Sequence, residues 1–178
     1  MILRSDCLIR SIRAIIALTL CICLIPSSAF ADDPKVESKL GFTEFLTTFA
    51  QIIEECQENV VKEIEKKVED HKFEVIVERA YAECGKPYVW GACGPSSYDC
   101  SGLVGYCITG EYSRIGTTYT FMGWPQIAEP RPGDVCVNNG HCGIYIGNGQ
   151  MIHAPQSGDV VKVGPVQSGM IYVRYPNL

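Results

Sequence analysis

The apolar residues between Phe42 and Val68 recur every three or four positions, and glutamate and lysine fill most of the positions between them. This period is typical of an amphipathic α-helix, in which one stripe of side chains is apolar and the remainder is polar. The stripe consists of Phe42, Phe45, Leu46, Phe49, Ile52, Ile53, Cys56, Val60, Ile64 and Val68. We expect it to pack on its own domain or on a partner. Membrane binding is less favoured, because the polar face is acidic.

A second pattern begins near Phe73. Residues 73–84 and 101–108 have helical spacing, and the first stretch stops at a Gly-Lys-Pro sequence that is typical of a helix end. After Pro132 the chain alternates between short apolar runs and turn residues. We place strands at 135–137, 141–146, 150–154, 160–163 and 171–175. Helices followed by a run of short antiparallel strands predict an α+β domain, preceded by the amphipathic helix.

The first 31 residues have the three parts of a secretory signal peptide. Three arginines precede an apolar run from Ala14 to Ile25, and Ala29-Phe30-Ala31 offers small residues for cleavage. We therefore predict that the protein is secreted and is extracellular or associated with the cell wall. The alternative is an uncleaved membrane anchor, which is less favoured because the run is short for a spanning helix.

Charge is distributed unevenly beyond this segment. Residues 32–71 carry 11 acidic and 5 basic side chains, whereas residues 72–178 carry 8 acidic and 7 basic ones. Neither part has the basic stripe that binds nucleic acid, so we expect no nucleic-acid partner. The predicted organisation is a signal peptide (1–31), an acidic amphipathic helical segment (32–71) and a C-terminal domain (72–178).

Seven cysteines follow the predicted cleavage site: Cys56, Cys84, Cys93, Cys100, Cys107, Cys136 and Cys142. An odd number in an exported protein leaves at least one thiol without a partner in its own chain. We assign that free thiol to Cys100. The other six allow many disulfide pairings, and the sequence does not choose among them.

Cys100 directly follows Asp99, a residue type that commonly caps the start of a helix. Backbone N–H groups in the first turn of a helix have no partner within the helix, and the helix dipole favours negative charge there. Both effects lower the pKa of a thiol, and the same N–H groups can hold an oxyanion. Cys100 is therefore a candidate nucleophile.

Two histidines, His141 and His153, lie in consecutive predicted strands joined by Gly147-Asn148-Gly149. A two-residue loop would place the histidines on opposite faces of the hairpin. We predict a three-residue loop instead, which pairs Ile146 with Gln150 and places Gly149 in the left-handed conformation.

In this register Gly143 lies opposite His153, and His141 becomes its diagonal neighbour on the same face. Glycine at position 143 leaves room there for two imidazole rings. Cys142 then points to the other face, so we treat it as structural.

Cys100, His141 and His153 together fit the nucleophile, base and orienting group of an acyl-transfer enzyme. Two alternatives stay open. The histidines can be unrelated strand residues, or the same three side chains can bind a catalytic zinc ion. The position of Cys100 at a helix start already explains its thiol as a nucleophile, so we expect no metal and no cofactor.

Five short motifs occur in order along the C-terminal domain: Tyr88-Val89-Trp90-Gly91, Asp99 through Val104, Pro132 through Val135, His141 through Gly149, and Ile152-His153-Ala154. In these motifs, from about Phe73 to its end, the chain resembles the NlpC family of papain-like cell-wall cysteine endopeptidases. The resemblance implies a papain-like fold with N-terminal helices packed on a small antiparallel sheet.

The resemblance also implies roles for individual residues. Cys100 would be the nucleophile, His141 the base and His153 the third polar residue. Tyr88 would hold the oxyanion together with the Cys100 backbone N–H. The positions that match the substrate groove are Trp90, Asp99, Ser101 and Arg114.

The implied reaction is hydrolysis of peptidoglycan stem peptides, usually between the side-chain carboxyl of D-glutamate and diaminopimelate or lysine. Two other functions stay open: an amidase or acyltransferase on the same scaffold, and a non-catalytic cell-wall assembly protein. Two positions depart from the family pattern, Ala92-Cys93 and Cys142. The wall-binding repeats that the family often carries are not visible, so residues 42–68 would mediate self-association or docking on a partner.

Overall fold

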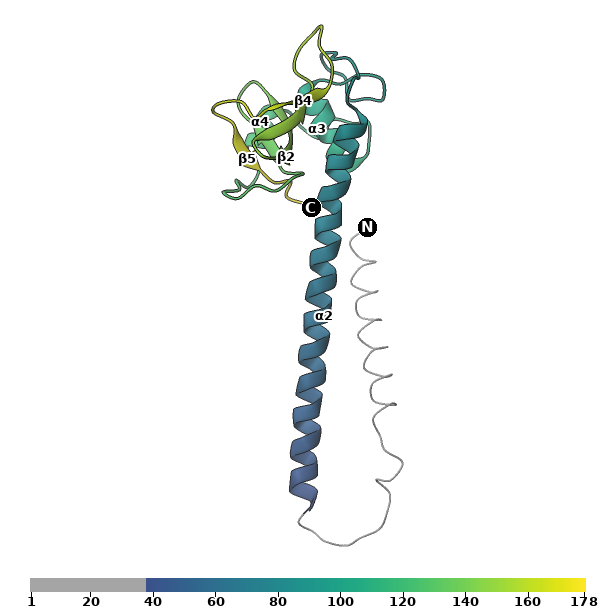
Figure 1. Cartoon of the computed structure of the whole chain (residues 1–178), viewed down its shortest axis with the longest axis vertical. Helices are drawn as coiled ribbons and strands as arrows, with labels where there is room; N and C mark the ends of the chain where they lie inside the picture. The colour runs from purple at the N-terminus through teal and green to yellow at the C-terminus, as the bar shows by residue number, and fades with distance from the viewer. Residues whose placement is uncertain (1–37) are drawn as a thin grey trace. The chain divides into compact units, whose positions relative to one another are not determined.

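The computed structural model describes residues 38–178, and the predicted signal peptide lies outside them. The chain divides into two compact units, one up to Lys67 and one from Val68 to Leu178. Helix α2 (Ser38–Ala82) begins in the first unit and ends in the second (Figure 1). The two helical stretches predicted at 42–68 and 73–84 are therefore one helix, which neither proline nor glycine interrupts between Gly41 and Gly85.

In the first unit, α2 is exposed along much of the predicted stripe. Ile52, Val60 and Ile64 expose between 44% and 52% of their surface. The polar face carries Lys–Glu pairs four residues apart, such as Lys67 with Glu63 at 3.0 Å, which support an isolated helix. Within residues 38–178, none of the helices combines the length and apolar character that crossing a membrane requires. Docking or self-association through residues 42–68 stays a prediction.

The second unit contains the end of α2 and two further helices, α3 (Cys100–Thr109) and α4 (Thr118–Met122). Helix α3 begins where the Asp99 carboxylate accepts from the Gly102 backbone N–H, and it ends at Gly110 in the left-handed conformation. Helix α4 was not predicted. Its five residues are too few to show a helical period, although threonines at its start are typical of a helix cap.

Five antiparallel strands form one sheet in the order β4-β3-β2-β1-β5. Their bounds are β1 (Val135–Val137), β2 (Cys142–Gly147), β3 (Gln150–His153), β4 (Lys162–Pro165) and β5 (Ile171–Val173). Four strands lie within about two residues of their predicted positions, and β4 is shifted two residues toward the C-terminus. The predicted α+β fold, helices packed on a small antiparallel sheet, is confirmed.

Helix α3 and the sheet share one hydrophobic core. Leu103 and Val104 of α3 are fully buried, together with Ile144 of β2 and Ile152 of β3. Removing these side chains from water is the main driving force that fixes α3 on the sheet. The packing places α3, whose first residue is Cys100, on β2, which His141 directly precedes, and on β3, which ends at His153.

The loop before α3 lies directly on the first turn of that helix. A Cβ atom at Gly102 would come within 2.1 Å of the Ala92 carbonyl oxygen and 2.9 Å of the Cys93 Cα atom. Only glycine allows this approach, and the Asp99 backbone N–H donates to the same Ala92 oxygen at 2.9 Å. The loop therefore fixes where the helix begins.

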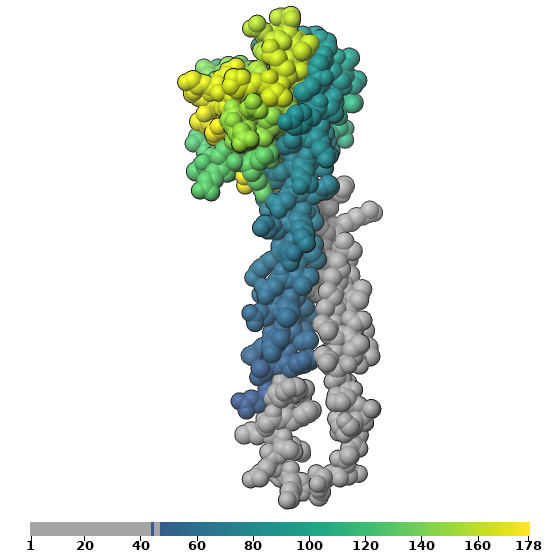
Figure 2. Space-filling view, in the orientation of Figure 1, coloured from purple at the N-terminus to yellow at the C-terminus, as the bar shows by residue number. Residues whose placement is uncertain are grey.

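The segment around Val161 is hydrogen-bonded to the residues that directly follow α2. The Val161 backbone donates to the Lys86 carbonyl and accepts from the Gly85 N–H, both at 2.8 Å. In the space-filling view the residues after β3 (yellow) accordingly lie against the segment that follows α2 (teal) (Figure 2).

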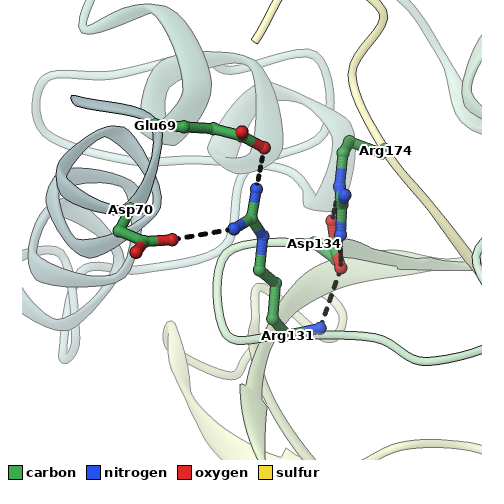
Figure 3. Close-up of polar contacts among 5 residues, drawn as sticks. All are labelled: Glu69, Asp70, Arg131, Asp134 and Arg174. Atoms are coloured by element: carbon green, nitrogen blue, oxygen red, sulfur yellow. Dashed lines mark hydrogen bonds and ion pairs between the residues drawn. The ribbon is translucent and has the colours of Figure 1, made fainter. Parts of the chain in front are cut away.

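Residues 69 and 70 of α2 form ion pairs with the loop that precedes β1 (Figure 3). Arg131 binds Glu69 and Asp70, with 3.0 Å between its Nη1 and the Asp70 Oδ1. Its backbone N–H donates to the buried Asp134 carboxylate, which also accepts from the Arg174 guanidinium at 2.8 and 2.9 Å. Within the second unit, this part of α2 is thus linked to the loop before β1 and, through Asp134, to the residue that follows β5.

We expect Asp134→Ala to lower the free energy of unfolding by about 2–4 kcal/mol, because it leaves a half-buried Arg174 without its partner. Glu69→Ala is the matched control. Its carboxylate is half exposed, so its loss should cost less than about 1 kcal/mol. Urea unfolding of both variants measures the difference, and equal costs would contradict this account.

Candidate active site

Cys100 lines a cavity of about 460 Å³, which we call the Cys100 groove. It is lined by Trp90, Gly91, Asp99, Cys100, Ser101, Arg114, Thr117, Thr118, Tyr119, Asn139 and Gly140. All four residues predicted to contact substrate are among them. His141 and His153 are buried, at 8% and 6% exposure, and are not part of the lining.

The pKa of the Cys100 thiol is lowered to about 5. A hydrogen bond with the Cys142 thiol is the largest cause, and a hydrogen bond with His141 and the charge of that ring add to it. Burial and the negative charge of Asp99 act in the opposite direction without cancelling these effects. Cys100 is therefore mostly thiolate at neutral pH, and the thiolate is the nucleophilic form of cysteine.

The contact between Cys142 and Cys100 corrects the sequence analysis, which set Cys142 apart from the site. Cys142 points toward the sheet face that α3 covers, and α3 begins with Cys100. Complete burial, followed by the hydrogen bond with Cys100, raises the pKa of Cys142 well above its usual value. Cys142 therefore stays protonated and donates to the Cys100 thiolate.

The two histidines lie side by side. The distance between His141 Nε2 and His153 Nδ1 is 2.7 Å, and the ring centroids are 5.0 Å apart. Because Nε2 of His141 is used here, Nδ1 is the ring nitrogen left for the Cys100 thiol. Burial, followed by the charge of His141, lowers the pKa of His153 to about 4, so His153 is neutral at neutral pH. A neutral imidazole in this position can orient the His141 ring.

The turn that joins the two histidine strands differs from the prediction. Asn148 and Gly149 form a two-residue turn with φ angles of 53° and 69°, and Gly147 pairs with Gln150. The predicted three-residue loop is therefore wrong. Two successive left-handed residues match the twist of the strands, and Asn-Gly suits that turn. The extra residue, Ile146, is taken up by a bulge in β2.

Because the bulge adds one residue, both histidines still lie on one face, as predicted. Beyond it, Ile144 pairs with Ile152, which is the predicted register. A Cβ atom at Gly143 would lie 3.1 Å from the His153 Cβ and 2.8 Å from the Ile152 carbonyl oxygen. A side chain at this position would therefore collide with β3, including the Cβ atom of His153.

A second glycine lies against the other side of His153. A Cβ atom at Gly164 of β4 would come within 2.7 Å of the His153 Nε2. The ring is therefore confined between the backbone of β4 and the His141 ring. Gly164 was not a predicted site residue, because its role appears only when β4 pairs with β3.

Asn138 holds the turn that precedes His141. Its side-chain oxygen accepts from the backbone N–H groups of Gly140 and His141, at 3.0 and 2.9 Å. Its own backbone N–H donates to the His141 carbonyl at 2.9 Å. Asn138 was not predicted as a site residue, although Asn-Asn-Gly before a strand is a turn signal in which the asparagine side chain bonds to nearby backbone.

Asp99 is surrounded by four hydrogen-bond donors. Its carboxylate accepts from the backbone N–H groups of Gly91 and Gly102 at 2.9 and 2.7 Å, from the Ser101 hydroxyl at 3.1 Å, and from Arg114 at 2.8 Å. Arg114 also donates to the Ser101 hydroxyl. The Asp99 carboxylate is thus fully used within the protein, and Arg114 is held beside Cys100.

Tyr88 was predicted to hold the oxyanion together with the Cys100 backbone N–H. Burial, followed by the negative charge of Cys100, raises the pKa of its hydroxyl. The phenol therefore stays protonated at neutral pH and remains a hydrogen-bond donor. Its backbone is fixed by the N–H bond to the Asp159 carbonyl at 2.9 Å.

All seven cysteines in the described part of the chain are free thiols. Between residues 38 and 178, no three or more histidine, cysteine, aspartate or glutamate side chains are arranged to hold a metal ion. At the groove the Cys100 thiolate lies with the imidazoles of His141 and His153 and the phenol of Tyr88.

Known proteins share this architecture. The profile of the NlpC/P60 family matches residues 85–177, just over half of the chain. The peptidoglycan endopeptidase RipA of Mycobacterium tuberculosis is 37% identical over 126 residues, which are 57% of this chain and 27% of RipA. The chain spans only about a fifth to a quarter of the length of such curated relatives.

Solved structures include catalytic and non-catalytic proteins. The peptidoglycan hydrolase RipB of M. tuberculosis is 29% identical with a TM-score of 0.51, covering 59% of this chain and 65% of RipB. RipD of M. tuberculosis, described as a non-catalytic NlpC/p60 domain protein adapted to peptidoglycan binding, is 25% identical with a TM-score of 0.50, covering 58% and 96%. The profile match and the papain-like fold together show that this chain belongs to the NlpC/P60 family.

Proposed function

We propose that the chain is a secreted cysteine endopeptidase that hydrolyses peptidoglycan stem peptides. The observation that carries this proposal is geometric: Cys100 begins α3 at the groove, and the Nε2 atom of His141 lies 2.7 Å from the Nδ1 atom of His153. The hydrogen bond and charge of His141 also help to lower the pKa of Cys100, which supports the proposal. A protein that only binds the wall has no need for this arrangement. Relatives named as peptidoglycan endopeptidases support the substrate class.

The proposed cycle begins with attack of the Cys100 thiolate on the amide carbonyl carbon. The Cys100 backbone N–H and the Tyr88 hydroxyl hold the resulting oxyanion. His141 gives a proton to the leaving amine, and a thioester remains on Cys100. A water molecule, deprotonated by His141, then releases the acid product and restores the thiolate. His153 keeps the His141 ring in position throughout.

The bond cut in this proposal joins the side-chain carboxyl of D-glutamate to diaminopimelate or lysine, as in the family that the motifs resemble. Trp90 and Arg114 contact the substrate from the walls of the groove. Asp99 and Ser101 act through Arg114, because their polar atoms are already bonded within the protein. Residues 1–31 direct export.

Replacing Cys100 by alanine removes the nucleophile, and we expect it to reduce cleavage of purified peptidoglycan to background. Cys84→Ala is the matched control, since that thiol is exposed and does not line the groove. Mass spectrometry of the products identifies the bond. An amidase would release the intact stem peptide from the glycan, and transfer of the acyl group would yield a new amide or ester. Full cleavage by Cys100→Ala would refute the proposed mechanism.

The acid limb of the pH dependence should follow the Cys100 thiol. With a pKa of about 5, alkylation of Cys100 by iodoacetamide, followed by peptide mass analysis, should reach half its maximal rate near pH 5. Cys142→Ala removes the donor to the thiolate, which disfavours the charged form and shifts this midpoint to higher pH. Cys142→Ser keeps a donor and should shift it less. An unchanged midpoint in Cys142→Ala would show that the thiol contact does not activate Cys100.

Gly164→Ala tests the position of His153. The added methyl group would meet the His153 Nε2 and push the ring away from His141. We expect kcat to fall roughly tenfold to a hundredfold with little change in Tm, because the ring moves more easily than the strand. Val163→Ala, an exposed change on the same strand, should leave both unchanged. A loss of Tm equal in size to the loss of activity would indicate a folding defect instead.

A further inference from the structure

Two free thiols are in contact beside the Cys100 groove. Cys100 is the first residue of α3 and lines the groove, and Cys142 is the first residue of β2, on which α3 packs. Cys142 has no exposed surface, and its thiol is hydrogen-bonded to Cys100. A disulfide requires two sulfur atoms that can approach each other directly. The hydrogen bond already brings these two together, with no other atom between them.

A thiol at position 142 offers more than a hydrogen-bond donor. Cys142 is one of the positions that depart from the family pattern, so that pattern does not explain its presence. A thiol is only a weak donor, and a hydroxyl would serve the Cys100 thiolate better. Hydrogen bonding alone therefore does not call for cysteine here. A second thiol beside the nucleophile can, however, react with it once the nucleophile is oxidised.

Cys100 is the thiol that an oxidant meets first. It lines the groove, and its lowered pKa makes it mostly thiolate at neutral pH, which is the form that peroxides oxidise. Cys107 and Cys136 are buried, and burial raises the pKa of both thiols. Cys142 is also buried and protonated, so it is shielded from peroxide in solution. Its accessible partner is an oxidised Cys100.

We propose that Cys100 and Cys142 form a site of reversible oxidation, at which a hydroperoxide converts the two thiols into a disulfide and blocks the nucleophile. In the first step the Cys100 thiolate attacks one oxygen of hydrogen peroxide, the O–O bond breaks, and a sulfenic acid forms with release of hydroxide. In the second step the Cys142 sulfur attacks the Cys100 sulfur, the S–O bond breaks, and the Cys142 proton leaves with the hydroxyl as water. The two sulfurs together lose two electrons, which the peroxide takes up.

The first step removes part of what keeps Cys142 protonated. Burial is the largest cause of its raised pKa, and the hydrogen bond with Cys100 and the negative charge of Cys100 follow. A sulfenic acid in its protonated form is neutral, so the effect of that charge disappears. His141 is hydrogen-bonded to the same Cys100 sulfur and can pass the proton from Cys142 to the departing hydroxyl.

Cys93 is the rival partner for Cys100. It lies in the loop on the first turn of α3, where a Cβ atom at Gly102 would come within 2.9 Å of the Cys93 Cα atom. Its thiol, however, donates to the Gly91 carbonyl oxygen at 4.0 Å, whereas the Cys142 thiol is hydrogen-bonded to Cys100 itself. We therefore assign the disulfide to Cys142. This inference goes beyond the proposed function, since it does not depend on which bond the groove cuts.

Peptide mapping after treatment of the reduced, purified protein with excess hydrogen peroxide tests the assignment. We expect a Cys100–Cys142 cross-link in unreduced digests, and dithiothreitol should restore most of the iodoacetamide labelling of Cys100. In Cys142→Ser the cross-link cannot form and Cys100 goes on to sulfinic acid. Relative to the untreated variant, dithiothreitol should then restore at least about fivefold less labelling. Cys93→Ala is the matched control and should behave as the native protein does.

The site would be overturned by the absence of a cross-link in the native protein, by a cross-link that joins Cys100 to Cys93, or by equal recovery in the native protein and Cys142→Ser. The map of the native protein needs no variant, so a folding defect in Cys142→Ser does not decide the test. Cleavage of peptidoglycan is scored separately. A protein that forms the cross-link but cleaves no peptidoglycan after reduction would refute the proposed hydrolysis and leave the oxidation site standing.

Discussion

The arrangement of the site depends on the buried carboxylate of Asp99. Its two oxygens bind donors from three separate segments: the loop at Gly91, the first turn of α3, and Arg114 beyond that helix. The same carboxylate caps α3, so it decides that the helix begins at Cys100. One side chain thereby sets the thiol position, the loop that carries Trp90 and the guanidinium beside the groove. The family resemblance places Asp99 in the substrate groove. In the structure its carboxylate also joins the three segments that form this groove.

Much of the fold can be predicted from the sequence, because the patterns that indicate its turns, strands and helix starts are local. The Gly-Asn-Gly turn, the alternating strands and the Asp-Cys helix start each lie within a few residues, and they correctly predicted a helix packed on an antiparallel sheet. The histidines were placed on one face for a partly wrong reason, since the loop length was misjudged and the bulge at Ile146 compensated for it. Turn type and bulge depend on strand twist, which spacing alone does not reveal.

The features that the sequence did not reveal depend on contacts between distant segments. Gly164 matters only because β4 lies against His153, and Cys142 only because α3 covers its face of the sheet. Helix α4 is too short for a period, although it carries Tyr119. The break expected within α2 was inferred from a change in apolar pattern. That change reflects burial of one part of a continuous helix, with no interruption of its backbone.

The hydrogen bond between the Cys142 thiol and the Cys100 thiolate affects how the reactivity of Cys100 depends on ionic strength. The largest stabilising influence on the Cys100 thiolate is an uncharged donor that is fully buried. Dissolved ions weaken attraction between exposed charges, but they have little effect on a neutral hydrogen bond inside the protein. The share of the activation that comes from Cys142 is therefore little affected by ionic strength, unlike the share that comes from the charge of His141.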